Sequence, residues 1–145
     1  MLDKPARRLL DRPGLLGVVC TTRGDGSPQA NPLWFRRAGD HIRIWTDEER
    51  RWVANLRRAP HVAFSVHENV SPWASVTIRG TAAIDPLTSE AIDAEIRRIC
   101  ARYIADAEID AYVDDWPQTR SIVTIHPHSV FTAQAFDDPV AHRRT

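Results

Sequence analysis

Two short glycine-containing turns in the first third of the chain constrain the fold more than any other feature. Arg23-Gly24-Asp25-Gly26 and Arg37-Ala38-Gly39-Asp40 each lie between segments with the composition of β-strands. Turns of this length join antiparallel strands, because a parallel connection needs a crossover of a dozen or more residues. We therefore expect a meander of antiparallel hairpins and not a doubly wound parallel sheet.

The segments around these turns predict six or seven short strands with helices inserted between them. His41–Thr46 and His61–His67 alternate apolar and polar residues, as half-buried strands do. The other expected strands are Leu15–Thr22, Pro28–Arg36, Trp73–Asp85 with a bulge at Gly80, and two closing strands, Ser121–Ile125 and Val130–Ala135, broken at Pro127. The expected helices cover residues 4–12, 50–58 and 85–104, and the polar segment up to Pro117 has room for one more. The pattern predicts an α+β fold built on a small closed antiparallel barrel.

Bulk properties narrow the class of function. A chain of 145 residues predicts a single domain, here residues 1–145. Its 19 basic and 19 acidic residues balance, which disfavours a general nucleic-acid or membrane-surface role. No segment is apolar enough to be a signal peptide or to span a bilayer, so we expect a cytoplasmic protein. Cys20 and Cys100 are expected to be buried free thiols, since their spacing fits neither a redox pair nor a zinc site.

The segment from residue 45 to residue 60 predicts a phosphate site. A strand containing Thr46 runs into an acidic and then arginine-rich turn, and a short helix follows until Pro60. The N-terminus of a helix offers unpaired N–H donors and partial positive charge, and arginine adds charged donors. The candidates for holding the phosphate are Thr46, Arg50, Arg51 and Asn55, and Trp52 could pack against a ring.

Three other groups of residues could carry a function. Two prolines, Pro28 and Pro32, leave backbone groups free around Gln29 and Asn31, whose amides could pair with the edge of a flat heterocycle. Trp73 is a candidate for stacking on a ligand or for burial at a dimer interface. His126 and His128 have no acidic residue nearby to complete a metal site, so no metal is expected.

Three motifs make the chain resemble the pyridoxamine 5'-phosphate oxidase-like split β-barrel family. Asp25–Phe35 is similar to the family's Asp-Gly-x-Pro-x-x-x-Pro-x-Trp strand pair, and Asn55–Val62 to its Asn-Leu-Arg-Arg-Asp-Pro-Arg-Val segment. Thr77–Ala82 is similar to the end of its long strand, Val-x-Gly-x-Ala. Within the family, the chain looks most like the branch that uses the deazaflavin coenzyme F420.

The resemblance implies a homodimer with cofactor sites in grooves at the subunit interface. It implies that Gln29, Asn31 and Pro32 line the cofactor ring, with its phosphate against the turn and helix from Thr46 to Asn55. The cofactor supplies the chemistry in such enzymes, so no catalytic residue of the protein is expected. The function it implies is hydride transfer from reduced coenzyme F420 to a small conjugated or heterocyclic acceptor, in a pocket shaped by Trp34 and Trp73.

The chain departs from the family pattern at one position. Trp52 stands where the family carries a lysine, three residues before the asparagine of the Asn-Leu-Arg-Arg motif. Either Arg50 or Arg51 replaces the missing ammonium, or Trp52 stacks on the ligand. Two alternatives therefore stay open: an FMN-dependent oxidoreductase of the same fold, and a non-catalytic protein that binds a flavin or another planar ligand such as haem.

Overall fold

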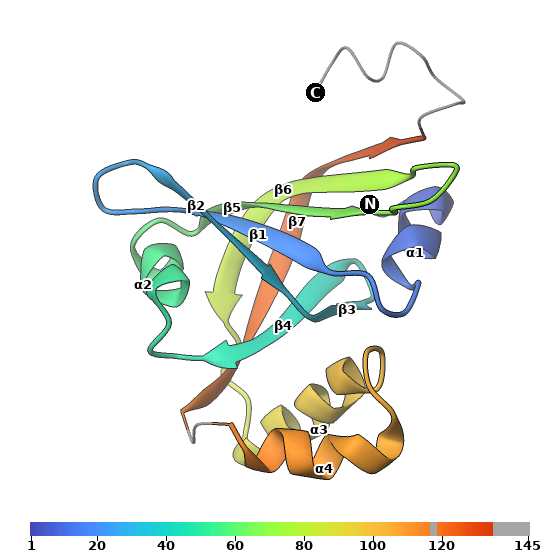
Figure 1. Cartoon of the computed structure of the whole chain (residues 1–145). Coiled ribbons are helices and arrows are strands. Elements are labelled where there is room, and N and C mark those ends of the chain that lie inside the picture. Colours follow the sequence, from blue (N-terminus) through green and yellow to red (C-terminus); the bar gives the residue numbers. More distant parts are fainter. Residues whose placement is uncertain (117–118, 135–145) are drawn as a thin grey trace.

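The computed structural model describes residues 1–116 and 119–134 (Figure 1). Its elements, in chain order, are α1 (Lys4–Leu10), β1 (Gly17–Thr22), β2 (Pro28–Leu33), β3 (Phe35–Ala38), β4 (His41–Asp47), α2 (Arg51–Arg58), β5 (His61–His67), β6 (Ser75–Ile84), α3 (Ser89–Cys100), α4 (Asp106–Asp114) and β7 (Arg120–Ala133). Pro117 and Ala135, which end two expected segments, lie outside the described residues. In the part of the chain that is described, no helix is long and apolar enough to cross a membrane.

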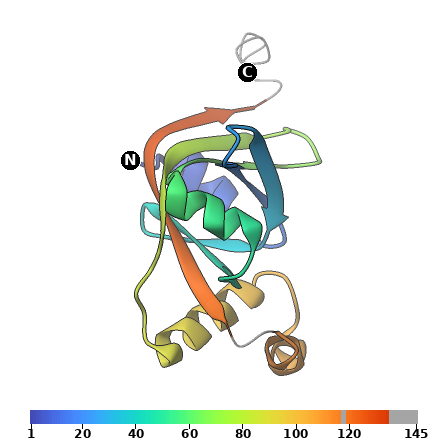
Figure 2. The same ribbon diagram turned by 90° about the vertical axis from the view of Figure 1, so that its left-hand side faces the viewer.

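The strands form one curled antiparallel sheet in the order β2-β1-β5-β6-β7-β4-β3. The predicted α+β class and the antiparallel hairpins are confirmed, but the barrel is split and not closed. Its two edge strands, β2 and β3, follow each other directly in the chain. In Figure 1, α1 and α2 lie on opposite sides of the curled sheet, and α3 and α4 lie below it, as they also do after the turn of 90° in Figure 2.

The expected single strand Pro28–Arg36 is wrong, because Trp34 divides it. Residues up to Leu33 pair with β1, and residues from Phe35 pair with β4. The segment therefore changes partners within one residue and passes from one edge of the sheet to the other. Arg37 and Ala38, expected in a turn, belong to β3.

The expected break of the closing strands at Pro127 is also wrong. One strand, β7, runs through Pro127, and the sheet accommodates it with a register shift beside Gly80. The predicted bulge at Gly80 is thereby confirmed. A Cβ at this position would lie 2.2 Å from the carbonyl oxygen of His126, so only glycine allows β7 to approach this closely.

The helices begin where local capping allows. α3 begins at Ser89 and not near residue 85, because the Thr88 hydroxyl accepts a hydrogen bond from the N–H of Ala91 and caps the helix. Asp85 instead continues the sheet, since its N–H donates to the carbonyl of Ile122. The room for a short helix after residue 104 is filled by α4.

Apolar side chains pack on both faces of the β4–β7 strand pair. Ile42, Ile44 and Ile125 point into the barrel, where α1 and α2 close the core. Trp45 and Ile122 point to the opposite face and pack against α3 and α4. The barrel therefore has its own core, and the α3–α4 pair is attached to the outside of the sheet by a second one.

The two cysteines differ in environment. Cys100 is fully buried in the second core, as expected, and burial raises the pKa of its thiol to about 11. Cys20 is only half-buried, because it is on the outer face of β1. Both are free thiols, as predicted.

A buried carboxylate holds α3 against the sheet. Glu95 is 1% exposed and receives hydrogen bonds from the guanidinium of Arg36, with further charge from Arg43 and Arg98. Burial by itself raises the pKa of the Glu95 carboxyl, but the hydrogen bonds and charge of Arg36, with the charge of Arg43, outweigh burial and hold that pKa below its ordinary value.

We expect Glu95→Ala to lower the free energy of unfolding by about 1–3 kcal/mol, because it leaves the half-buried Arg36 and Arg43 without their shared counter-charge. The stabilisation by Glu95 should be present above the ordinary glutamate pKa of about 4.3 and be lost as the pH falls through the lower folded-state value. Urea unfolding across the acid range measures both effects. The exposed Glu90 on the same helix is the control, and Glu90→Ala should change the unfolding free energy by less than about 1 kcal/mol. Equal effects of the two variants would contradict this role.

Candidate functional site

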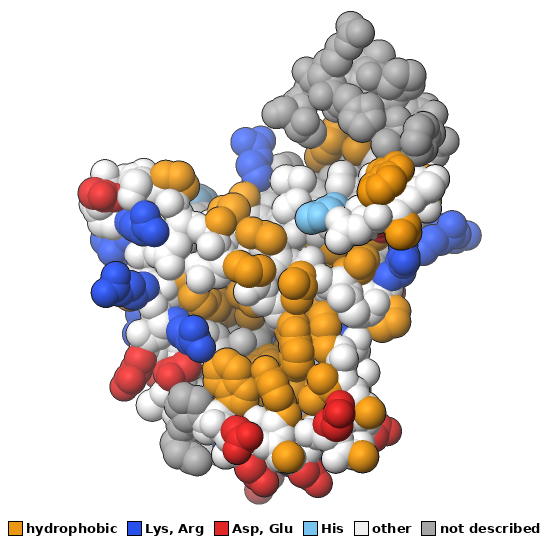
Figure 3. Space-filling view, in the orientation of Figure 1, with side chains coloured by type: hydrophobic (Ala, Val, Ile, Leu, Met, Phe, Trp, Pro, Cys, Tyr) orange, Lys and Arg blue, Asp and Glu red, His pale blue; other side chains and the backbone are white. Residues whose placement is uncertain are grey.

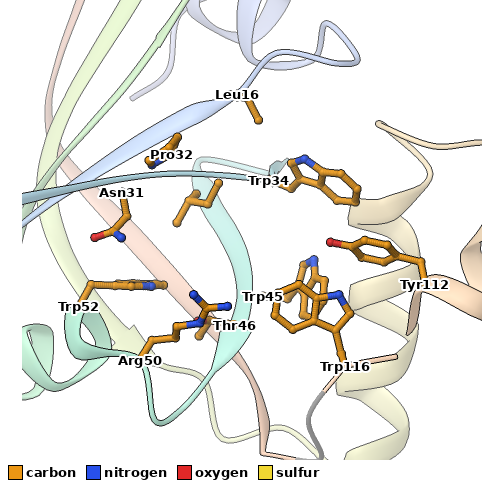
Figure 4. Close-up of a pocket in the computed structure, with 11 residues that line it drawn as sticks. Leu16, Asn31, Pro32, Trp34, Trp45, Thr46, Arg50, Trp52, Tyr112 and Trp116 are labelled. Carbon is orange, nitrogen blue, oxygen red and sulfur yellow. The ribbon is translucent and has the colours of Figure 1, made fainter. Parts of the chain in front are cut away.

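A groove of about 290 Å³ opens between the sheet, α2 and α4. Its walls come from the end of β2, from β4, from the turn before α2, and from α4 with the residues just after it (Figure 4). The residues that line it are Leu16, Asn31, Pro32, Leu33, Trp34, Trp45, Thr46, Arg50, Trp52, Tyr112 and Trp116. Figure 3 shows this hollow as a patch of hydrophobic side chains, with acidic side chains below it and basic ones to its left.

One wall of the groove is aromatic, and Trp34 is at its centre. The Trp34 ring is stacked between Tyr103, at 4.7 Å between ring centroids, and Tyr112, at 4.9 Å. Trp45 and Trp116 continue the wall with an edge-to-face contact at 4.4 Å. Because the Trp34 ring is stacked between two tyrosines, it meets a ligand by its edge, and a flat ring would contact this wall edge-to-face. Aromatic pairs of this kind contribute roughly 0.5–1.5 kcal/mol each beyond area burial.

The phenol of Tyr103 fixes Trp34 from behind. Its hydroxyl donates to the carbonyl of Leu15 at 2.7 Å and accepts from the N–H of Phe35 at 3.2 Å. Burial raises the pKa of this phenol, so it stays protonated. These hydrogen bonds satisfy the backbone at the point where the chain passes from β2 to β3.

The opposite wall carries the positive charge. Arg50 is the N-cap residue of α2, and no side chain caps this helix, so the first N–H groups of the helix lack a side-chain acceptor. The Arg50 guanidinium forms no salt bridge among the described residues and lies over the ring of Trp116, 5.7 Å from its centroid. An uncapped helix N-terminus beside an unpaired guanidinium suits a phosphate.

A chain of hydrogen-bonded amides supports the floor of the groove. The buried Asn55 donates through Nδ2 to Thr21 Oγ1 and to Gln29 Oε1, each at 3.0 Å. Gln29 Nε2 in turn donates to Asn31 Oδ1 at 3.2 Å. Of these residues, Asn31 lines the groove. The Asn31 amide is therefore positioned by Asn55 of α2 through the side chain of Gln29.

The predicted site residues fall into two groups. Asn31, Pro32, Trp34, Thr46, Arg50 and Trp52 all line the groove. Gln29 and Asn55 lie behind it in the amide chain, and Arg51 is exposed outside it. Trp73 is 47% exposed in the β5–β6 connection and does not line the groove of its own subunit.

Trp52 is a structural residue as well as a lining one. It is 4% exposed and belongs to the barrel core with Val53 and Leu56. The indole therefore replaces the family's lysine with a rigid apolar wall and leaves Arg50 as the groove's cation.

Sequence reasoning missed Trp45, Tyr112 and Trp116. Trp45 directly precedes Thr46, and its side chain was assigned to the strand alone. Tyr112 and Trp116 are in the polar segment after α3, where two aromatic residues among carboxylates were the available signal. Only the packing of α4 against β4 places them beside Trp34.

Two histidines weighed for metal binding have other contacts. His126 Nδ1 lies 3.2 Å from His41 Nε2, and His128 Nε2 lies 3.3 Å from Thr81 Oγ1. Within residues 1–116 and 119–134, no group of three or more potential ligands could hold a metal ion.

The family model for pyridoxamine 5'-phosphate oxidase matches residues 2–134, nearly the whole chain. The protein belongs to this family. Its split antiparallel barrel is the fold that the three sequence motifs predicted.

Solved structures with the same fold include proteins of different kinds. An F420 reductase is 26% identical, with a TM-score of 0.68 over 86% of this chain and 94% of that chain. A conserved hypothetical protein of Mycobacterium tuberculosis is 20% identical, with a TM-score of 0.75 over 94% and 87% of the two chains. A haem-binding protein from Mycobacterium smegmatis is 17% identical, with a TM-score of 0.67 over 95% of this chain and 57% of that chain. No curated protein sequence matches the chain closely enough to count as a relative.

We expect Asn55→Ala to destabilise the protein by about 1–3 kcal/mol, because it leaves Thr21 and Gln29 without their shared buried donor. Asn31→Ala, at the open end of the same chain of amides, should cost less than about 1 kcal/mol. Chemical unfolding of the two variants measures the difference. A larger loss for Asn31→Ala than for Asn55→Ala would contradict the ordering of this network.

Proposed function

We propose that the protein is an oxidoreductase that holds coenzyme F420 in the aromatic groove and reduces a small conjugated or heterocyclic acceptor. The observation that carries the proposal is the pairing of a stacked aromatic wall around Trp34 with the unpaired Arg50 at the uncapped start of α2. Family membership and the likeness to an F420 reductase over most of both chains support it.

The residues present fit a flavin-type cofactor. Arg50 and the first N–H groups of α2 would hold a phosphate, and the Asn31 amide, fixed through Gln29 by Asn55, would pair with the edge of the ring. When bound, the reduced cofactor supplies the hydride. Trp34, Trp45 and Trp116 would orient a flat acceptor and keep water away from it.

FMN is the second candidate, because it also combines a flat ring with a phosphate. Both cofactors would use the same aromatic wall and the same cation, so only their measured affinities distinguish them. Fluorescence titration of the purified protein with F420 and, in parallel, with FMN is the direct test. Tight binding of F420 alone supports the proposal, and preference for FMN transfers the function to the FMN-dependent branch. Binding of neither contradicts a redox role for the groove.

We expect Arg50→Ala to weaken cofactor binding at least tenfold, about 1.4 kcal/mol, because Arg50 is the only cation among the described residues that line the groove. The neighbouring Arg51 is exposed and outside the groove, so Arg51→Ala changes the net charge equally and should leave the affinity within about twofold. Titration of both variants with the same cofactor makes the comparison. Equal losses of affinity in the two variants would show that the phosphate is held by the general positive charge of this region and not by Arg50 in particular.

A second subunit would complete the groove. Its volume of about 290 Å³ is just below the roughly 300–1,000 Å³ typical of small-molecule sites, so a flavin-sized ligand needs further walls. Leu16 at the rim is 50% exposed, and Val70, Trp73 and Phe131 are further exposed apolar side chains. We propose a homodimer in which Trp73, from the β5–β6 connection of one subunit, contributes to the groove of the other.

Trp73→Ala should therefore weaken both dimerisation and cofactor binding while leaving each subunit folded, because the side chain is not in either core. Light scattering coupled to size exclusion measures the mass, and the cofactor titration measures the affinity. Leu16→Ala is the companion variant, since Leu16 lines the groove of its own subunit. A monomeric wild type would refute the dimer without refuting cofactor binding.

A further inference from the structure

A second groove lies away from the aromatic one, where β1, β5, β6 and β7 come together. It holds about 580 Å³, within the roughly 300–1,000 Å³ typical of small-molecule sites. It shares no lining residue with the aromatic groove. The cofactor proposal leaves this space without a role.

The bulge in the β6–β7 pair builds this groove. Arg79 pairs with Ser129 and Gly80 with Pro127, so His128 is the extra residue of β7 and has no partner on β6. Its imidazole lies 3.3 Å from the hydroxyl of Thr81. Thr81 is also the cross-strand partner of His61, so the bulge brings two histidines from β5 and β7 to the same residue of β6.

The side chains around this groove favour an anion. Arg79, His61 and His128 line it, together with the hydroxyl-bearing residues Thr22 and Ser129, and none of the described residues that line it is acidic. The Arg79 guanidinium forms no salt bridge among the described residues, and the hydrogen bond that its Nε donates to Ser129 Oγ is long, at 3.4 Å. Such an arginine is available to a ligand, and its fork of donors suits a phosphate.

A phosphate fits this set better than a carboxylate does. A guanidinium, two imidazoles and two hydroxyls provide more hydrogen-bond donors than the two oxygens of a carboxylate can accept. A phosphate group presents three acceptor oxygens and can therefore use more of these donors. Pro28, Val62 and Ala63 give the same groove an apolar part. We propose that this groove is a second ligand site, which binds a small molecule through its phosphate group at Arg79, His61 and His128. The proposal does not depend on the function proposed for the aromatic groove.

Cys20 supplies a reporter for this site. Its half-buried thiol lines the groove, whereas Cys100 is buried and its pKa is raised to about 11 by burial. A thiol-alkylating reagent should therefore modify Cys20 first, because reactivity follows thiolate content and access. A ligand seated in this groove would cover Cys20 and slow the reaction.

The experiment titrates the full-length protein with inorganic phosphate at constant ionic strength. The rate of Cys20 alkylation and the imidazole NMR signals are followed together. We expect phosphate to slow alkylation and to shift the signals of His61 and His128, while His67, at the other end of β5, is unaffected. Arg79→Ala should raise the phosphate concentration needed for half-protection at least tenfold. Arg8→Ala, which removes an exposed arginine from α1, should leave that concentration unchanged.

The outcomes separate this site from the aromatic groove. Unchanged alkylation and unchanged His61 and His128 signals would overturn the proposal, as would equal behaviour of Arg79→Ala and Arg8→Ala. Loss of phosphate binding in Arg50→Ala with retention in Arg79→Ala would also overturn it, because the phosphate would then be in the aromatic groove. Arg79 is exposed, so Arg79→Ala is expected to fold, and circular dichroism verifies this.

Discussion

The position of Trp34 between β2 and β3 is the constraint on which the rest of the structure depends. At this residue the chain leaves one edge of the sheet and joins the other, so the barrel is open along this line. The indole of Trp34 is stacked between Tyr103, which follows α3, and Tyr112, which lies on α4. One residue thus opens the barrel and attaches the helical pair that forms the far wall of the groove.

The groove combines two independent supports. Its charged side depends on α2, whose uncapped N-terminus and Arg50 face the cavity, while the same helix buries Trp52 and Leu56 in the barrel core. Its aromatic side depends on α3 and α4, and the buried Glu95 of α3 forms ion pairs with Arg36 and Arg43 of the sheet. Rigid elements on both sides hold the lining residues, which is what a site that orients a flat ligand needs.

The sequence predicts local features of this protein better than contacts between distant segments. The hairpin turns, the bulge at Gly80, and the group of Thr46, Arg50 and Trp52 follow from short-range patterns, and the structure places all three residues of that group along one groove. Tyr112 could not be placed in this way, because it meets Trp34 only through the packing of α4. The division of the second strand at Trp34 was missed for a related reason. The alternation of apolar and polar residues stops at Leu33-Trp34-Phe35, but only the two different partner strands show that the segment divides there.

The α3–α4 pair has its own small core, separate from the interior of the barrel. It is inserted between two neighbouring strands of the sheet, β6 and β7. It meets the barrel through the second core, which includes Trp45 and Ile122 of the sheet, and through one ionic cluster and one stack of rings. The two parts can therefore diversify separately. Substitutions at Tyr112 or Trp116 would change which molecules the groove accepts, while the barrel and the Arg50 side keep their architecture. A single scaffold could therefore acquire new ligand preferences through changes in the α3–α4 pair alone.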